Sequence, residues 1–133
     1  MMEEIKVSVV QFEPKPFREK EKNAEFIIEK INELGDDNDL IIFPEASLTN
    51  FFETGPNARL EFWKYAEPLD GKYIKLIMEA AKQKDVHVIF GFAEKTERDL
   101  YIYNSAMLVA PEGIKGVYRK IHLPRHEKFF FTP

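Results

Sequence analysis

Apolar residues recur along the chain at two spacings, which predicts strands alternating with helices. Ile5, Val7 and Val9 alternate with polar residues ahead of Pro14 and predict a first strand. Residues 17–34 carry apolar side chains three and four positions apart and end at Gly35, the pattern of an amphipathic helix and its C-terminus. Residues 40–43 form a short continuous apolar run, which indicates a strand buried on both faces.

The rest of the chain continues this alternation. Residues 46–68 are irregular and aromatic, with a short helix expected at 57–65, and a second amphipathic helix is expected up to residue 84. Alternating residues predict strands at 86–92, 101–110 and 114–119, the last two separated by a turn at 111–113. The predicted order is βαβαβββ, which indicates an α/β fold with helices packed on one or both faces of a sheet.

Composition limits the classes of protein to which the chain can belong. Its 133 residues suit one ordinary domain, and with no cysteine the core must form without disulfides. No apolar run is long enough to span a membrane and the first residues lack a signal-peptide pattern, so we expect a cytoplasmic protein with no membrane partner. Acidic and basic residues are interspersed at a net charge of −4, which argues against nucleic-acid binding.

Glu45 is the first candidate for chemistry. It follows the apolar run at 40–43, and ligand sites in open α/β sheets lie at the carboxyl ends of strands. A carboxylate flanked there by apolar walls is suited to general acid and base catalysis. The alternative interpretation is an ordinary solvated glutamate in a loop.

Lys120 is the second candidate, at the end of the strand predicted at 114–119. An ammonium held at a strand end can stabilise an oxyanion, although most lysines are simply surface groups. Glu127 lies close enough in sequence to orient that ammonium. His122 and His126 are four residues apart, but Pro124 between them prevents a shared helical face, so we predict no metal site.

Several segments together resemble one known family, the nitrilase superfamily of carbon-nitrogen hydrolases. They occur in the family's order and include Val9-Val10-Gln11, Phe43-Pro44-Glu45, Gly91-Phe92 with Glu94, Tyr103-Asn104-Ser105-Ala106, and Tyr118-Arg119-Lys120-Ile121-His122-Leu123-Pro124. The resemblance implies that Glu45 is the general base, that Lys120 stabilises the tetrahedral intermediate, and that Glu127 is a second functional glutamate. Residues 127–131 look most like the branch that cleaves N-carbamoyl amides.

The chain departs from the family in having no cysteine, because the family's nucleophile is a cysteine located beyond the lysine motif. By resemblance, residues 1–133 would be a partial domain, the first half of a four-layer α-β-β-α sandwich. The implied function is hydrolysis of a small amide, carbamoyl or nitrile substrate without a cofactor, and we expect the isolated chain to be inactive. We also expect it to form a homo-oligomer or to pair with a complementary half, because half a sandwich leaves a sheet face uncovered.

Other interpretations stay open. The chain could be a truncated, non-catalytic paralogue that serves as an interaction module, one half of a split enzyme, or a small-molecule binder that uses the same cleft without chemistry. The aromatic tail at 129–131 could itself cover the open sheet face. Whether Glu45, Lys120 and Glu127 converge in space is the first structural test of the catalytic interpretation.

Overall fold

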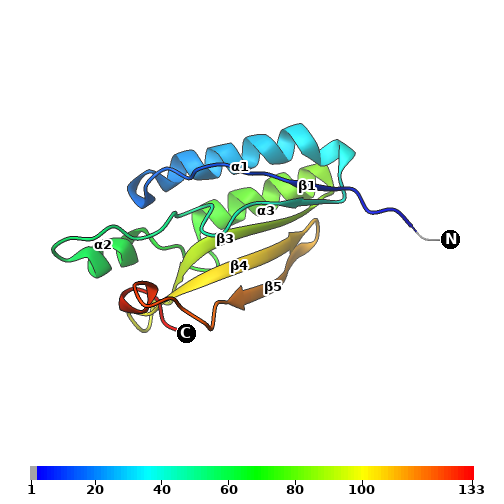
Figure 1. Cartoon of the computed structure of the whole chain (residues 1–133). Helices are drawn as coiled ribbons and strands as arrows, with labels where there is room; N and C mark the ends of the chain where they lie inside the picture. The colour runs from blue at the N-terminus through cyan, green and yellow to red at the C-terminus, as the bar shows by residue number, and fades with distance from the viewer. Residues whose placement is uncertain (1–2) are drawn as a thin grey trace.

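Five strands form one mixed sheet in the computed structural model, which describes residues 3–133 (Figure 1). The strands are β1 (Val7–Val9), β2 (Leu40–Ile42), β3 (His87–Lys95), β4 (Ile102–Ala110) and β5 (Gly113–Arg119), and they lie side by side in that order. The first three are parallel, and β4 and β5 are antiparallel to their neighbours. The α/β fold class predicted from the sequence is confirmed.

Two helices cover one face of this sheet. They are α1 (Lys20–Leu34) and α3 (Lys72–Lys84), which cross between successive parallel strands and lie next to each other in Figure 1. A short helix, α2 (Ala58–Tyr65), lies in the aromatic segment, close to where the sequence predicts it. Single 3-10 turns are present at η1 (Phe17–Glu19), η2 (Gly35–Asp37) and η3 (Glu127–Phe129), so the helix predicted from residue 17 begins with a 3-10 turn.

The main hydrophobic core lies between the sheet and the two helices. Cross-strand pairs such as Val88 with Val109 and Phe90 with Met107 face the helices, and all four residues are fully buried. From the helices, Ile27 and Ile77 pack into the same core. Because alternate strand residues point to opposite faces, the residues between these pairs lie on the face without helices.

That second face, the helix-free face, is open. Val7 and Val9 of β1 are 46% and 74% exposed, and Tyr118 of β5 is 62% exposed. The prediction that the strand at 40–43 is buried on both faces is wrong for β2, where Ile41 is buried but Leu40 and Ile42 are only partly so. The reason is that no second layer lies on this face within residues 3–133.

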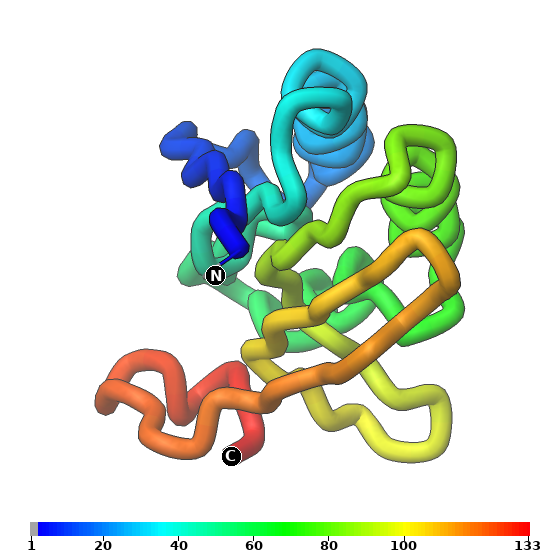
Figure 2. Tube along the Cα trace, turned by 90° about the vertical axis from the view of Figure 1, so that its right-hand side faces the viewer, coloured from blue at the N-terminus to red at the C-terminus, as the bar shows by residue number. Residues whose placement is uncertain are grey.

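The aromatic tail packs at one end of the sheet. Phe130 stacks on Phe52 with 3.6 Å between ring centroids, and Phe131 is buried against Phe62. The backbone N–H of Thr132 donates to the carbonyl of Ile102 at 2.7 Å. Figures 1 and 2 place the tail where β4 begins and β5 ends, so it covers that end of the sheet and leaves the rest of the helix-free face exposed.

No helix formed by residues 3–133 combines the length and the apolar character needed to cross a membrane.

Candidate active site

The three residues predicted from the sequence come from three separate segments. Glu45 lies in the loop that follows β2, Lys120 comes directly after β5, and Glu127 begins the turn η3. The side chains of Glu45 and Lys120 are 51% and 30% exposed, whereas that of Glu127 is 7% exposed. The site therefore has a buried carboxylate on one side and a solvent-accessible one on the other.

The structure brings these three charged groups together. The Nζ of Lys120 lies 3.0 Å from Oε1 of Glu45 and 3.2 Å from Oε1 of Glu127. The convergence predicted from the sequence is confirmed. One ammonium bridges two carboxylates, an arrangement that keeps a positive charge fixed between them.

The two carboxylates also set the protonation of the lysine. The hydrogen bond to Glu45 raises the pKa of Lys120 above its ordinary value, and the hydrogen bond to Glu127 adds to this effect, while partial burial opposes it. Lys120 is therefore protonated at neutral pH. A permanently charged ammonium is suited to stabilising a developing oxyanion and is unsuited to accepting a proton.

Glu127 is the buried member of the site. Its Oε2 is buried and has no hydrogen-bond partner among residues 3–133, while its Oε1 contacts Lys120. A buried carboxylate needs a nearby positive charge, because leaving the aqueous solvent penalises the ionised form. Lys120 supplies that charge, so Glu127 in turn restricts where the ammonium can lie.

Asn104 is a member of the site that the sequence-based interpretation missed. In the sequence it lies in a family-like segment within a predicted strand and has no assigned role at the site, but in β4 its Nδ2 donates to Oε1 of Glu45 at 2.6 Å. Its backbone carbonyl accepts the N–H of Lys120 at 2.8 Å. The available signal was a carboxamide inside a largely apolar strand, because a buried polar side chain needs a partner.

The backbone around Glu45 is held close to β3. Gly91 packs so near the loop that a Cβ atom built there would lie 2.4 Å from the backbone nitrogen of Ala46. Ala46 itself has a left-handed backbone with φ of 55°. Ser47 then accepts the N–H of Gly91 at 3.0 Å through its Oγ, and its own N–H donates to the carbonyl of Pro44.

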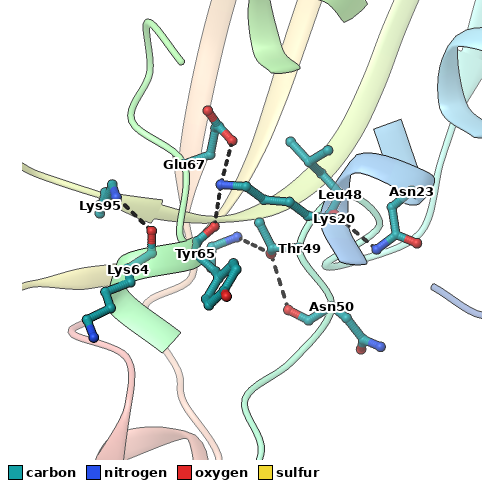
Figure 3. Close-up of polar contacts among 10 residues, drawn as sticks. Lys20, Asn23, Leu48, Thr49, Asn50, Lys64, Tyr65, Glu67 and Lys95 are labelled. Carbon is teal, nitrogen blue, oxygen red and sulfur yellow. Dashed lines mark hydrogen bonds and ion pairs between the residues drawn. The ribbon is translucent and has the colours of Figure 1, made fainter. Parts of the chain in front are cut away.

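Figure 3 shows how the next residues of this loop are fixed. Thr49 Oγ1 accepts the N–H of Ala93 at 2.7 Å, and Asn23 of α1 donates to the carbonyl of Leu48 at 3.1 Å. The loop is thus attached both to β3 and to α1. Glu45 therefore projects from a backbone with little freedom to move, although its side chain is half exposed.

An ion pair between Arg119 and the buried Glu94 holds the end of β5 beside Lys120. Glu94 is buried and accepts hydrogen bonds from Ser105 Oγ at 2.7 Å and from Nε of Arg119 at 3.0 Å. The guanidinium of Arg119 also lies 3.9 Å from the centroid of the Tyr103 ring. The hydrogen bond to Glu94 raises the pKa of Arg119. Because Arg119 immediately precedes Lys120, this pair fixes the strand end from which the lysine projects.

The charged groups open onto a cleft on the helix-free side of the sheet, with a volume of about 240 Å³. Its walls are largely apolar. They include Phe43, Pro44, Ile89, Gly91, Ala106 and Tyr118. Such a cleft can hold a small group with an apolar portion next to the ammonium and the carboxylates.

Neither a metal nor a serine nucleophile is indicated at this site. Among residues 3–133, no group of three or more His, Cys, Asp or Glu side chains is arranged to hold a metal ion. Ser47 is close to Glu45 in sequence, but it is fully buried and its hydroxyl is hydrogen-bonded to the backbone of Gly91. The groups that the chain contributes are therefore a carboxylate, an ammonium and a second carboxylate.

Comparison with known proteins identifies the family. The sequence profile of the carbon-nitrogen hydrolases matches residues 6–133. An (R)-stereoselective amidase from a Pseudomonas species is 41% identical over 97 residues, covering 73% of this chain and 33% of the amidase. A nitrilase from Pyrococcus abyssi is 38% identical over 135 residues, covering 97% of this chain and 48% of the nitrilase.

The fold agrees with this family. A solved CN-hydrolase superfamily protein from Xanthomonas campestris superimposes with a TM-score of 0.80 at 22% identity, covering 98% of this chain and 46% of that protein. The chain therefore belongs to the carbon-nitrogen hydrolase family, within the nitrilase superfamily. It spans about half the length of the nitrilase and a third of the amidase.

Proposed function

We propose that this chain supplies the base and the oxyanion-stabilising group of an enzyme that hydrolyses non-peptide carbon-nitrogen bonds. The observation that carries the proposal is the contact of Lys120 with both Glu45 and Glu127 at the edge of an apolar cleft. Family membership and the names of the amidase and nitrilase relatives support the same reaction class. The resemblance to the family implies a cysteine nucleophile, which would come from outside these 133 residues because they contain no cysteine.

In the proposed reaction, each of the three charged groups has a role. Glu45 accepts the thiol proton, and the resulting thiolate attacks the carbonyl carbon of an amide. With a nitrile, the attack gives a thioimidate, which adds one water before ammonia leaves and the same thioester remains. Lys120 stabilises the negative charge that develops on the substrate atom of the tetrahedral intermediate. Glu45 then returns a proton to the departing amine or ammonia. Finally it removes a proton from the water that hydrolyses the thioester, while Glu127 keeps Lys120 in place.

We further propose a small amide, carbamoyl compound or nitrile as substrate. The relatives' names support amides and nitriles, and the resemblance of residues 127–131 to the N-carbamoyl-cleaving branch supports the carbamoyl compounds. The modest, largely apolar cleft favours a compact acyl group. Ammonia release from one member of each class, measured side by side, separates the three substrate types.

The test of the proposal uses the chain joined or mixed with the segment that carries the cysteine. Glu45→Gln keeps the shape of the side chain but removes the base, so kcat should fall by roughly 10²- to 10⁴-fold. The matched control is Glu112→Gln, because Glu112 also forms an ion pair with a lysine, Lys115, but lies in the turn between β4 and β5. The control variant should keep full activity.

The 133-residue chain alone should release no ammonia from any of these substrates. Ammonia release by the chain alone that is abolished in Glu45→Gln would show that an unrecognised nucleophile is present. Activity that appears only on mixing with a cysteine-bearing half would support a split enzyme.

The absence of a cysteine also supports a second candidate function, a non-catalytic interaction module. Its docking surface would be the helix-free face, which exposes Val7, Val9 and Tyr118. Full binding to a partner protein, unchanged by Glu45→Gln and without hydrolysis in the presence of any cysteine-bearing segment, would favour this function over the enzyme.

A further inference from the structure

We propose that Asn104 is a positioning residue that holds the Glu45 carboxylate so that only its Oε2 exchanges protons. This inference rests on the proposed function of Glu45 as the base. The family assignment gives Asn104 no part in the reaction, and the contacts among Glu45, Lys120 and Glu127 do not give it one either.

Asn104 is connected to both reacting groups. Its side chain donates to Oε1 of Glu45 at 2.6 Å, and its backbone carbonyl accepts the N–H of Lys120 at 2.8 Å. The residue is only 4% exposed and lies in β4, between neighbouring strands on both sides. A single residue of the sheet interior therefore holds both the Glu45 carboxylate and the backbone from which the Lys120 side chain projects.

The two oxygens of Glu45 are not equivalent as a result. Oε1 accepts from both Asn104 and Lys120, whereas Oε2 has no hydrogen-bond partner among residues 3–133. Two donors, one of them charged, withdraw electron density from Oε1 and make it a poor proton acceptor. Oε2 is left as the oxygen that takes the proton from the nucleophile and later from water.

The contact with Asn104 also restricts the orientation of the Glu45 carboxylate. Glu45 is half exposed, so Lys120 alone could hold it in several orientations, and a flexible base loses catalytic efficiency. The side-chain amide of Asn104 is fixed inside a strand, so its N–H points in one direction and favours one orientation of the Glu45 carboxylate. The neutral amide can do this without adding a fourth charge to the site, which a lysine or arginine at this position would do.

The first arm of the test detects the hydrogen bond itself by NMR in the ¹⁵N-labelled 133-residue chain. The side-chain amide signals of Asn104 should change between the unmodified chain and Glu45→Ala, because the variant lacks the carboxylate that accepts its N–H. The internal control is Asn38, whose Nδ2 donates to the carbonyl of Leu34 at 2.9 Å near the opposite end of β2. Its amide signals should be identical in both proteins.

The second arm measures kinetics on the chain joined or mixed with the cysteine-bearing segment. Asn104→Leu keeps a buried side chain of similar size but cannot donate, so kcat should fall by about 10²-fold with KM changed by less than about threefold. Asn104→Asp, which has the same shape but presents an acceptor, should be at least as impaired. Asn38→Ala removes a side-chain amide far from the site and should leave kcat unchanged.

Each result decides the inference. An unchanged kcat in a folded Asn104→Leu variant would overturn the proposed role of Asn104. So would Asn104 amide signals that are the same with and without the Glu45→Ala substitution. If Glu45→Gln retains full activity, the proposed function fails, and the NMR arm still shows whether Asn104 holds the carboxylate. If Asn104→Leu does not fold, the kinetics of Asn104→Asp and the NMR comparison with Glu45→Ala together provide the answer.

Discussion

Lys120 shows most clearly how single residues create the site. Its ammonium lies between Glu45 and Glu127, and hydrogen bonds to these carboxylates raise its pKa. A cation with a raised pKa contributes stability that is fully present below its ordinary pKa of 10.5 and is lost as the pH rises through the higher value of the folded state. The interaction is therefore complete throughout the neutral range in which an amidase or nitrilase reaction would be assayed.

Removing one carboxylate should reverse this shift. In Glu45→Gln we expect the pKa of Lys120 to move down toward 10.5, because the largest cause of the increase is the hydrogen bond to Glu45. An NMR titration of the lysine side-chain signals measures the change directly. In Glu112→Gln the Lys120 titration should be unaltered. An unshifted Lys120 in Glu45→Gln would mean that the two side chains are not in contact in solution.

At the same scale, the sequence identifies the charged residues of the site more readily than the buried polar one. Glu45 and Lys120 could be selected as candidates because each follows an apolar strand, where chemistry commonly occurs. Asn104 lies within a strand, and only the packing of β4 beside the Glu45 loop shows what its amide contacts. The catalytic roles of Glu45, Lys120 and Glu127 stay predictions until they are tested.

At the scale of the element, the close approach of β3 to the Glu45 loop determines the position of the base. Gly91 leaves space for the backbone of Ala46, and Ser47 and Thr49 tie the loop to Gly91 and Ala93. The loop follows β2 directly, so any displacement of it moves Glu45 relative to Lys120.

A methyl group at position 91 should therefore disrupt both stability and the site. In Gly91→Ala the new Cβ would lie 2.4 Å from a backbone atom, so the loop must shift. We expect a loss of roughly 1–3 kcal/mol in the free energy of unfolding, measured in urea. Gly116→Ala in β5 is the control, because nothing lies within 4 Å of its new Cβ. Equal stability of the two variants would show that the loop does not pack on β3 as described.

At the scale of the whole molecule, the sheet is protected on one face only. Val88, Phe90 and Met107 are buried in the main hydrophobic core between the sheet and the two helices, while Val7, Val9 and Tyr118 remain exposed on the helix-free face. The alternating apolar pattern by itself does not separate Val7 and Val9 from Val88 and Phe90. The structure separates them, because the pairing register puts the two valines of β1 on the face opposite to Val88 and Phe90.

We predict that the chain associates through the helix-free face, either with itself or with a complementary half. Burying apolar surface is favourable by about 25 cal/mol for each Å². Sedimentation of the 15.6 kDa chain at low micromolar concentration should show a larger species, and Val7→Lys should shift it toward monomer. Leu76→Lys is the control, since Leu76 is 44% exposed, like Val7 at 46%, but lies on α3. A monodisperse monomer that binds no hydrophobic dye would contradict the prediction.

The sequence by itself determined the elements and the three charged candidates. Period-two and period-3.6 patterns are local properties, so the strands and helices follow from them, and motifs with fixed spacing carried the resemblance to the family. The cytoplasmic location and the N-carbamoyl substrate branch were also inferred from the sequence, and both stay predictions.

Only the tertiary structure decided which residues meet. The contacts among Glu45, Asn104, Lys120 and Glu127 join segments separated by up to 75 positions in the chain, and strand order and register bring them together. The structure also decided which face of the sheet is covered, and that the aromatic tail packs on Phe52 and Phe62. These are long-range arrangements whose energy depends on the packing of the whole sheet, so no local pattern in the sequence encodes them directly.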